Sequence, residues 1–498
     1  MSDTDSKKTL RLSIKKTPET TTGRPKKSLA SGARAHRKAR QALEEQKQTP
    51  APLAERSGGR TRTGARDDAR TGFQRRDRPH TRSEQSPRRN GPPHSGTRQR
   101  PDRTSTRPTP QTFNPYAGRH KAFASCPRGL EAVLEEELIQ IGLDRVQAAS
   151  GGVQFETDWP GVQKANLWSR IATRILVQVA HAPVRYESDI TRLTLATPWE
   201  NWFGPDHTLR VDTSAIRSPM KSLQFCNLLV KDGICDRLRD REGARPSIDT
   251  VRPDARVHLF LSETTATLYL DTSGESLFKR GWRFNKGEAP IRENLAAGLL
   301  ALAGWTPEVP LLDPFCGSGT ILVEAAWQAL NVAPGINRPF AFERLRHHDH
   351  AQWQTMRQEA TEAILTPQDI PHVQISGYEL DVTSLDNARR NLKRAHVPDG
   401  LIRLKQANAC REPAPGASGL ILTNPPYGIR LETEDTLMTD WAAQLKQHFS
   451  GWTIGVISAD LDLPRNLRLK AKRRIPVFNG ALDCRLFMFD LVSGQYRN

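Results

Sequence analysis

The stretch that decides the fold is PLLDPFCGSGTILVEAAWQAL, residues 310–330. Its first part predicts a strand from Pro310 to Phe315 and its second part a helix from Ile321 to Leu330, with Gly317 and Gly319 in the turn between them. A strand that passes through glycines into a helix lets a ligand approach the backbone, and the N–H groups at the helix start can bind an anion. We therefore expect a ligand site at this turn.

A second informative turn, Asn424-Pro425-Pro426-Tyr427, lies about a hundred residues further along the chain. It follows an apolar stretch, Leu420–Thr423, that reads as a strand. The two prolines restrict the backbone, so the amide oxygen of Asn424 and the carbonyl of Pro425 are held in place beside the aromatic ring of Tyr427. These groups can accept hydrogen bonds from the exocyclic NH2 of a planar group and stack on its ring. The two turns together indicate methyl transfer from S-adenosylmethionine to an amino nitrogen.

Between and around these turns, apolar strands alternate with helical stretches. The strands that we expect are 309–315, 373–380, 402–407, 419–424 and 453–459, and each precedes a helix. Such alternation predicts a parallel sheet with helices on both faces. Two last strands, 474–477 and 485–491, leave no room for a helix and suggest an antiparallel hairpin at the edge. The second half is therefore predicted to be an α/β domain of the Rossmann-like, seven-stranded kind.

The preceding segment, from about Lys121, has a mixed α+β pattern. We expect its strands at 121–124, 153–156, 209–212, 257–261 and 267–270, and its helices at 129–141, 168–179 and 222–239. A polar, glycine-bearing stretch, Phe278–Lys286, reads as a linker.

Polar residues at successive strand ends outline a site for the methyl donor. Asp313 is placed to contact the donor's ammonium, Gly317 and Gly319 its amino-acid end, Glu379 both ribose hydroxyls, and Asn408 the adenine edge. Neighbouring residues included in this predicted donor site are Phe315, Thr320 and Asp381. Each polar residue alone could be an ordinary helix cap, but the ordered set is a strong signal.

The acceptor chemistry requires positioning more than a strong base. Hydrogen bonds from an exocyclic amine to Asn424 and Pro425 favour a pyramidal nitrogen whose lone pair faces the methyl group, and Tyr427 can stack on the base for about 1–3 kcal/mol. We take Asn424, Pro425, Pro426 and Tyr427 as the catalytic residues. No metal is needed for this chemistry, and we interpret His347–His350 as a solvated loop.

The basic excess is confined to the first quarter of the chain. Residues 1–120 carry 29 Lys and Arg against 11 Asp and Glu, which accounts for the whole net charge of +18, and the remaining residues carry 44 of each sign. Up to Thr112 this segment has a single aromatic residue, Phe73, and is predicted to be disordered. It is either an arm that tethers RNA or a tail that only aids solubility.

Other features limit the class of protein. Six cysteines without a CxxC pair argue against a disulfide framework or zinc ribbon. The N-terminus lacks the apolar core of a signal peptide, and no apolar run reaches the roughly 20 residues of a membrane span. We expect a cytoplasmic protein without a membrane partner.

With these motifs in order, the region from Lys121 to Leu491, about three-quarters of the chain, resembles the bacterial 23S rRNA guanine-N2 methyltransferases that carry a THUMP domain. The segments that carry the resemblance are Arg128–Glu131, Gly151–Val153, Leu167–Arg170, Lys231–Asp232, Arg280–Arg283, Glu293–Ala297, Leu312–Pro314, Cys316–Thr320, Ala333–Gly335, Thr423–Gly428, Asn479–Gly480 and Leu482–Cys484.

The resemblance implies a division of the chain and a substrate. The implied segments are a disordered basic tail at 1–118, a ferredoxin-like part at 119–160, a THUMP domain at 161–275, a linker at 276–289 and a methyltransferase domain at 290–494. The implied product is N2-methylguanosine, with 23S rRNA or an assembling large ribosomal subunit as partner, no obligate protein partner and S-adenosylmethionine as donor.

The chain departs from this family's pattern at several points. Members usually have aspartate where Glu379 and Asn408 stand, so contacts there are expected to differ. Some relatives carry a second methyltransferase half that makes 7-methylguanosine; this chain ends after its last strand, and we expect one activity.

Three alternatives remain open from the sequence. The Asn-Pro-Pro-Tyr turn also occurs in adenine-N6 and glutamine methyltransferases, because all three acceptors present an NH2. A transfer-RNA guanine-N2 enzyme with the same modules is the nearest rival. A non-catalytic RNA-binding assembly factor with a relic methyltransferase fold is the third.

Overall fold

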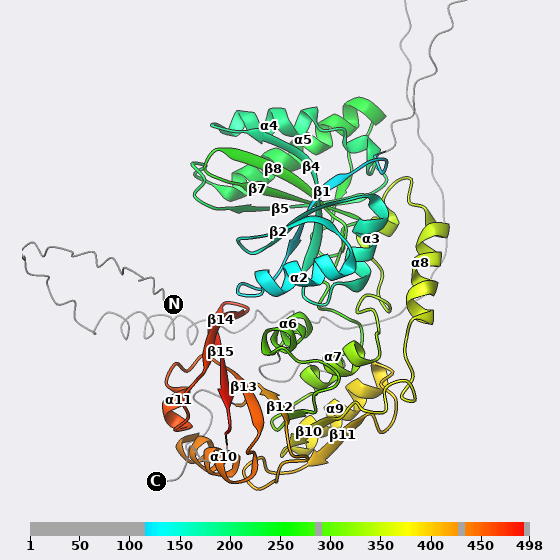
Figure 1. Ribbon diagram of the computed structural model, residues 1–498. Helices are drawn as coiled ribbons and strands as arrows, with labels where there is room; N and C mark the ends of the chain where they lie inside the picture. Colours follow the sequence, from blue (N-terminus) through cyan, green and yellow to red (C-terminus); the bar gives the residue numbers. More distant parts are fainter. Residues whose placement is uncertain (1–114, 284–290, 427–433, 493–498) are drawn as a thin grey trace, which may run out of the picture. The chain divides into compact units, whose positions relative to one another are not determined.

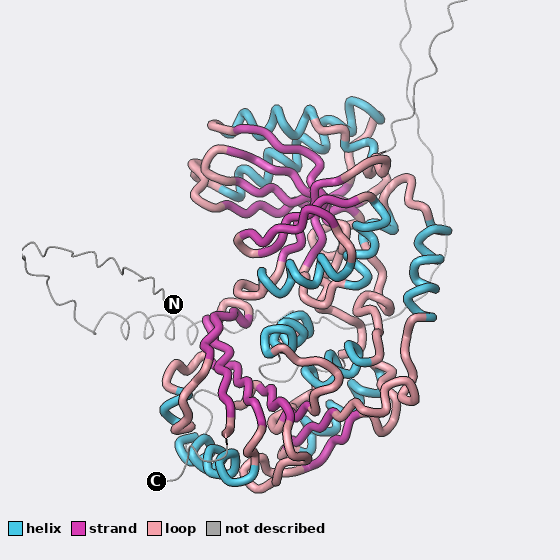
Figure 2. Tube along the Cα trace, in the orientation of Figure 1, coloured by secondary structure: helices cyan, strands magenta, loops and turns pink. Residues whose placement is uncertain are grey.

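A computed structural model describes residues 115–283, 291–426 and 434–492, all within one compact unit, Thr104–Asn498. The basic tail up to residue 114 and Tyr427 lie outside the described residues. The described chain contains two sheets, shown with their helices in Figures 1 and 2.

The first half builds an eight-stranded sheet. Its strands are β1 (His120–Ser125), β2 (Asp144–Ala149), β3 (Gly152–Thr157), β4 (Arg174–Pro183), β5 (Thr208–Ala215), β6 (Ser247–Ile248), β7 (Ala255–Leu261) and β8 (Thr265–Asp271), in the spatial order β2-β3-β1-β4-β8-β7-β5-β6. Its helices are α2 (Glu131–Ile141), α3 (Trp159–Trp168), α4 (Glu187–Ala196), the short 3-10 helix η1 (Trp199–Asn201) and α5 (Leu223–Glu242). Figure 1 shows α4 and α5 side by side along this sheet.

Pairing of β4 with β8 makes this one continuous sheet. β1 to β4 form the amino-terminal part and β5 to β8 the following part, and β4 pairs antiparallel with β1 on one side and with β8 on the other. We call residues 115–283 the RNA module from here on, after its expected role. Its mixed α+β architecture agrees with the sequence-based expectation.

One element of the module was predicted wrongly. The expected helix at 168–179 is instead the end of α3 followed by strand β4. α3 begins nine residues earlier because Asp158 caps it, accepting a hydrogen bond from Gly161 N at 2.8 Å, and Pro160 fits the first turn. The β-branched and apolar run Ile175–Val179 then favours a strand, which apolar spacing alone did not reveal.

The second half builds a seven-stranded sheet, as predicted. Its strands are β9 (Leu311–Asp313), β10 (Ile375–Glu379), β11 (Ile402–Gln406), β12 (Gly419–Thr423), β13 (Trp452–Ser458), β14 (Arg473–Asn479) and β15 (Leu482–Asp490), in the order β11-β10-β9-β12-β13-β15-β14. Its helical elements are α6 (Glu293–Ala303), α7 (Thr320–Ala329), η2 (Ala341–Arg344), α8 (His350–Glu362), α9 (Val382–Arg394), α10 (Glu434–His448) and α11 (Leu463–Asn466).

The first five strands of this sheet are parallel, and β14 and β15 form the antiparallel hairpin at its edge. Strand β12 shows why it lies in the centre. Its Leu420 and Leu422 join one hydrophobic core with Leu299 of α6, while Ile421 joins a second core with Trp441 of α10. A strand that is apolar on both faces needs helices on both faces, which is the arrangement that the sequence alternation predicted.

Strands are shorter than expected at several carboxyl ends. β9 stops at Asp313 because Pro314 has no N–H for the ladder, and β11 stops at Gln406, two residues before Asn408. These ends matter because they place the polar side chains of the site.

Two further findings concern the cysteines and the apolar length of the helices. All six cysteines lie in the described ranges, and none of them forms a disulfide. None of the helices in the described ranges is long and apolar enough to cross a bilayer.

Candidate functional site

The carboxyl ends of β9, β10 and β12 lie next to one another, since β9 pairs with both neighbours. The turn after β9 is built on two left-handed glycines, Gly317 at φ 53° and Gly319 at φ 78°, and Gly319 caps α7. A Cβ on Gly317 would meet nothing within 4 Å, so this backbone faces open space that a ligand can enter. A Cβ on Gly319 would meet Ala388 of α9 at 3.3 Å, and Asn391 donates from Nδ2 to the carbonyl of Ser318 at 2.9 Å. Helix α9 thus holds the turn from behind.

Glu379, the last residue of β10, fixes the turn from the side. Its Oε2 accepts a hydrogen bond from Gly317 N at 2.8 Å and its Oε1 one from Asp381 N at 3.0 Å. A carboxylate has about four lone-pair sites, so two remain for other donors such as ribose hydroxyls. The side chain of glutamate is longer than that of aspartate, and here it reaches both the turn at Gly317 and the turn at Asp381.

Asp313 is buried at the end of β9, with a relative exposure of 2 %. Its Oδ1 accepts from the hydroxyl of Thr423 at 2.6 Å and from Phe315 N at 3.2 Å. Burial raises the pKa of Asp313 to about 7, with a further contribution from the nearby charge of Glu379. The end of β9 therefore holds a carboxyl group that is ready to ionise when a cation binds beside it.

Asn424 lies directly after β12, next to Thr423. Its side-chain Oδ1 is buried and finds no hydrogen-bond partner among the described residues. A buried acceptor without a partner carries a free-energy cost, and such a group is explained when a ligand satisfies it. Pro425 is buried and Pro426 is exposed, and Tyr427 lies outside the described residues. The Thr423–Asp313 hydrogen bond joins this turn to the glycine turn.

The remaining predicted residues have local partners. Phe315 packs edge-to-face on Trp441 with ring centroids 5.1 Å apart. Asp381 is exposed and caps α9, accepting from Ser384 N at 2.7 Å. The Oδ1 of Asn408 accepts from Cys410 N at 2.9 Å. In this structure these three residues serve the local architecture of the strand ends.

Sequence reasoning included Thr320 in the donor site but did not assign the Arg283–Glu293 pair that lies beside it. The hydroxyl of Thr320, at the start of α7, accepts from Arg283 Nη2 at 2.9 Å, and Arg283 Nε donates to Glu293 at 2.8 Å. The Nη1 of Arg283 is buried and finds no acceptor among the described residues. Only the shared appearance of Arg280–Arg283 and Glu293–Ala297 in the family pattern hinted at this cluster, because its members lie far apart in sequence.

The histidine-rich segment is not purely a solvated loop. His347 is exposed, but His348 is half-buried against Phe342, and burial lowers the pKa of His348 to about 4. Asp349 caps α8 by accepting from Gln352 N at 3.0 Å. In the ranges that the structure covers, no three potential metal ligands gather.

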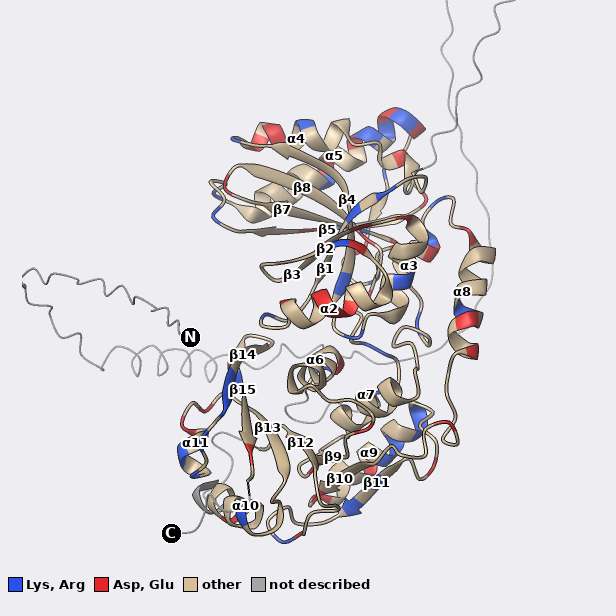
Figure 3. Ribbon diagram, in the orientation of Figure 1, with Lys and Arg blue, Asp and Glu red and all other residues tan. Residues whose placement is uncertain are grey.

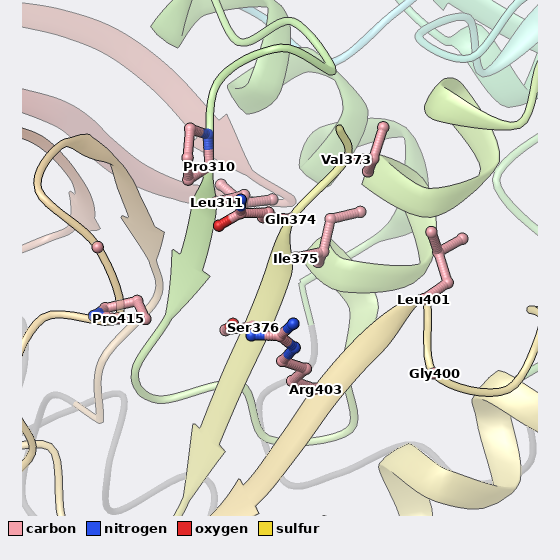
Figure 4. A pocket seen from close by; sticks show the side chains of 11 residues that line it. Pro310, Leu311, Val373, Gln374, Ile375, Ser376, Gly400, Leu401, Arg403 and Pro415 are labelled. Atoms are coloured by element: carbon pink, nitrogen blue, oxygen red, sulfur yellow. The ribbon is translucent and has the colours of Figure 1, made fainter. Parts of the chain in front are cut away.

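A small cavity of about 50 Å³ lies at the opposite end of the sheet (Figure 4). The residues that line it are Pro310, Leu311, Val373, Gln374, Ile375, Ser376, Gly400, Leu401, Arg403, Pro415 and Gly416. They lie at the amino ends of β9, β10 and β11 and before β12, whereas ligands of parallel α/β sheets bind at the carboxyl ends. We therefore place the site at the glycine turn and not in this cavity.

The sheet order, the glycine turn and the acid at the end of β10 define the methyltransferase type of Rossmann-like domain. Comparison with known proteins agrees. Residues 121–176 match the RlmL ferredoxin-like domain, residues 184–271 the THUMP domain and residues 280–487 the RMKL-like methyltransferase domain.

Individual relatives cover most of this chain. A putative RNA methyltransferase of Synechocystis is 36 % identical over 76 % of this chain and 97 % of its own length. A solved structure described as SMU.472, a putative methyltransferase complexed with SAH, is 31 % identical with a TM-score of 0.67 and covers 75 % of this chain and 98 % of its own. The chain therefore belongs to the family of S-adenosylmethionine-dependent RNA methyltransferases that combine ferredoxin-like, THUMP and RMKL-like domains.

Longer relatives match as well. The ribosomal RNA large subunit methyltransferase K/L of Pseudomonas aeruginosa is 37 % identical over 76 % of this chain, but the match covers 53 % of that protein. The chain thus spans about half the length of these curated relatives.

Proposed function

We propose that this protein transfers a methyl group from S-adenosylmethionine to the exocyclic N2 of a guanine in 23S rRNA, giving N2-methylguanosine. The observation that carries the proposal is the buried Oδ1 of Asn424, which no described residue satisfies and which is joined through Thr423 and Asp313 to the glycine turn. An exocyclic NH2 supplies the hydrogen that this oxygen lacks.

The donor fits the residues that are present. We assign its amino-acid end to the open backbone at Gly317 and the start of α7, its ammonium to Asp313 and its ribose hydroxyls to Glu379. When bound, the donor supplies a methyl group on a sulfonium sulfur that leaves as a neutral thioether.

The chain's own residues position the acceptor. Asn424 Oδ1 and the carbonyl of Pro425 accept hydrogen bonds from the amine, which keeps the nitrogen lone pair aimed at the methyl carbon. The N–C bond forms as the C–S bond breaks, the sulfur keeps that electron pair, and the amine releases one proton to solvent. The proposal requires no strong base, since the product ammonium is acidic once methylated.

The choice of rRNA rests on the RNA module and on the names of the K/L relatives. A transfer-RNA substrate has weaker support, because a solved structure described as TrmN from Thermus thermophilus is 20 % identical and shows the fold alone. Adenine is the alternative acceptor base, because it also presents an exocyclic NH2. A solved structure described as a predicted N6-adenine-specific DNA methylase from Listeria monocytogenes is 29 % identical with a TM-score of 0.68. A cytoplasmic location and the absence of an obligate protein partner remain parts of the proposal.

Asn424→Ala tests the acceptor turn. We expect methyl transfer to rRNA to fall by at least about 100-fold, as for loss of one preorganised polar contact in other active sites. Donor affinity, measured by calorimetry, should stay within about twofold of wild type, because Asn424 contacts the acceptor.

Asn408→Ala is the matched control, an asparagine that follows β11, which β10 and β9 separate from β12, and whose Oδ1 already has a backbone partner. Robust turnover by the Asn424 variant would contradict the mechanism. Failure of the wild-type protein to bind S-adenosylmethionine would favour a non-catalytic RNA-binding factor.

A further inference from the structure

A run of cationic side chains follows the edge hairpin of the catalytic sheet. Residues 465–474, RNLRLKAKRR, contain six Lys and Arg and no acid, and all six are exposed. Because the chain beyond residue 120 is neutral as a whole, this local excess is not a property of the average surface. Figure 3 shows it along β14 and around α11.

Most of these cations have no carboxylate partner. Lys472 pairs with Asp490 at 2.6 Å, whereas the other five have no ion pair with any described residue: Arg465, Arg468, Lys470, Arg473 and Arg474. Two nearby acids have other partners, since Asp483 pairs with Arg485 and Asp460 accepts from Asn466 Nδ2 at 3.0 Å. Cations of the RNA module are often paired instead, as Arg237 is with Glu200.

The strand register places this run level with the acceptor turn. Arg474 pairs with Phe487 of β15, Phe487 with Val456 of β13, and Val456 with Thr423 of β12. Paired residues point to the same face of a sheet, so Arg474 and Thr423 share one face and one transverse row. Three strand spacings separate them, about 14 Å. Asn424 follows Thr423, directly after the end of β12.

The RNA module extends the same surface. The exposed guanidinium of Arg128 lies over the ring of Phe478 in β14, 4.5 Å from its centroid, and Phe478 N donates to the Arg128 carbonyl at 3.1 Å. Phe478 and Arg474 lie on the same face of the strand, four residues or about 13 Å apart. One face of β14 therefore leads from the module to the row of the acceptor turn.

Protection of the sheet edge explains only part of this pattern. Charged residues on an edge strand prevent another strand from pairing with it. Arg465 and Arg468 lie before the strand, however, and Arg128 comes from the other half of the chain. The opposite edge, β11, carries Arg403 and Lys405, with Lys405 paired to Glu412 at 2.6 Å.

We propose that Arg465, Arg468, Lys470, Arg473, Arg474 and Arg128, which we call the hairpin strip, bind the RNA phosphate backbone and guide the target nucleotide across the sheet edge to Asn424. The inference rests on the proposed function for its choice of RNA as partner. Arginine suits this role, because its planar guanidinium can bind phosphate through two hydrogen bonds while stacking on an aromatic ring.

The test is binding of in vitro transcribed 23S rRNA by the full chain at several salt concentrations. For Arg473→Glu/Arg474→Glu we expect affinity to fall at least tenfold at low salt. The slope of log affinity against log salt should fall by about 1.4, which corresponds to two lost phosphate contacts at about 0.7 each. The basic tail is present in every variant, so it contributes equally to all of them.

Arg403→Glu/Lys405→Glu is the matched control, with the same charge change on the other edge strand of the same sheet. It should keep the wild-type slope and affinity, and donor affinity and melting temperature should be unchanged in both variants. Equal losses in both double variants, or no loss in either, would overturn the hairpin strip. This readout does not depend on methyl transfer. A wild-type protein that binds rRNA through the strip yet transfers no methyl group would refute the proposed function alone.

Discussion

At the residue scale, the site depends on how the buried polar atoms of the strand ends are satisfied. Asp313 and Glu379 both accept backbone hydrogen bonds in the turns they join, whereas Asn424 Oδ1 finds no partner in the part of the chain that the structure describes. The sequence predicted which of these residues follow strands, because strand and turn signals are local. The hydrogen bonds of Thr423 to Asp313 and of Arg283 to Thr320 were not predictable, because each partner comes from a different element that only the fold brings near.

The raised pKa of Asp313 makes stability depend on pH. Because its pKa is about 7 in the folded chain and ordinarily 3.8, its contribution to stability is greatest below pH 3.8 and is lost as pH rises to about 7. Asp313→Asn stays uncharged and keeps an acceptor oxygen for Thr423 and Phe315. We therefore expect the variant to gain melting temperature relative to wild type at pH 8 but not at pH 4.

Donor binding should show the opposite dependence. A cationic ammonium beside Asp313 favours the carboxylate, so wild-type affinity for S-adenosylmethionine should weaken as pH falls from 8 to 6, with proton release on binding below pH 7. Calorimetry in buffers of different ionisation enthalpy measures that release. The Asp313→Asn variant should bind weakly at every pH; a pH-dependent, wild-type-like affinity would exclude Asp313 from the donor site.

At the element scale, alternation and glycine turns predicted the parallel strands and the edge hairpin of the catalytic sheet. The module was harder, because β4 and the end of α3 share one apolar run whose helix or strand state depends on pairing with β1 and β8. The loop that carries Arg128 shows how closely elements approach. A Cβ on Gly129, at φ 92°, would lie 2.1 Å from the carbonyl oxygen of Pro476 in β14.

Gly129→Ala should therefore destabilise the chain through both backbone strain and collision. Gly142, at φ 89° and with only the flexible end of Lys164 near, isolates the strain. We expect about 1 kcal/mol of lost unfolding free energy for Gly142→Ala and at least about 2 kcal/mol more for Gly129→Ala, measured by urea unfolding. Equal losses would mean that the contact between the Arg128 loop and β14 does not persist in solution.

At the scale of the whole molecule, buried charges join the RNA module to the catalytic sheet. Arg280 is 1 % exposed and pairs with Glu324 of α7 at 3.3 Å, and Arg170 donates to the carbonyl of Val332 at 2.7 Å. Helix α7 begins at the glycine turn, so the module is fixed to the helix that starts at the proposed donor site. The residues expected as a linker thus include one of the most buried arginines.

The positive charge of the chain is concentrated in two places. The tail holds the whole net excess, and the hairpin strip is a local excess on a neutral remainder. Deleting residues 1–112 should weaken rRNA binding and flatten its salt dependence if the tail tethers RNA, while leaving donor affinity and melting temperature unchanged. An unaltered salt slope would show that the tail only aids solubility.

Mass spectrometry can identify directly which nucleoside receives the methyl group. Unmodified 23S rRNA, naked and in partly assembled large subunits, should be incubated with the full chain and S-adenosylmethionine carrying a deuterated methyl group, digested to nucleosides and measured by mass spectrometry. We expect the label in N2-methylguanosine with the wild-type chain and no label with Asn424→Ala. Label in a methylated adenosine, in 7-methylguanosine or in no nucleoside of either substrate would contradict this expectation.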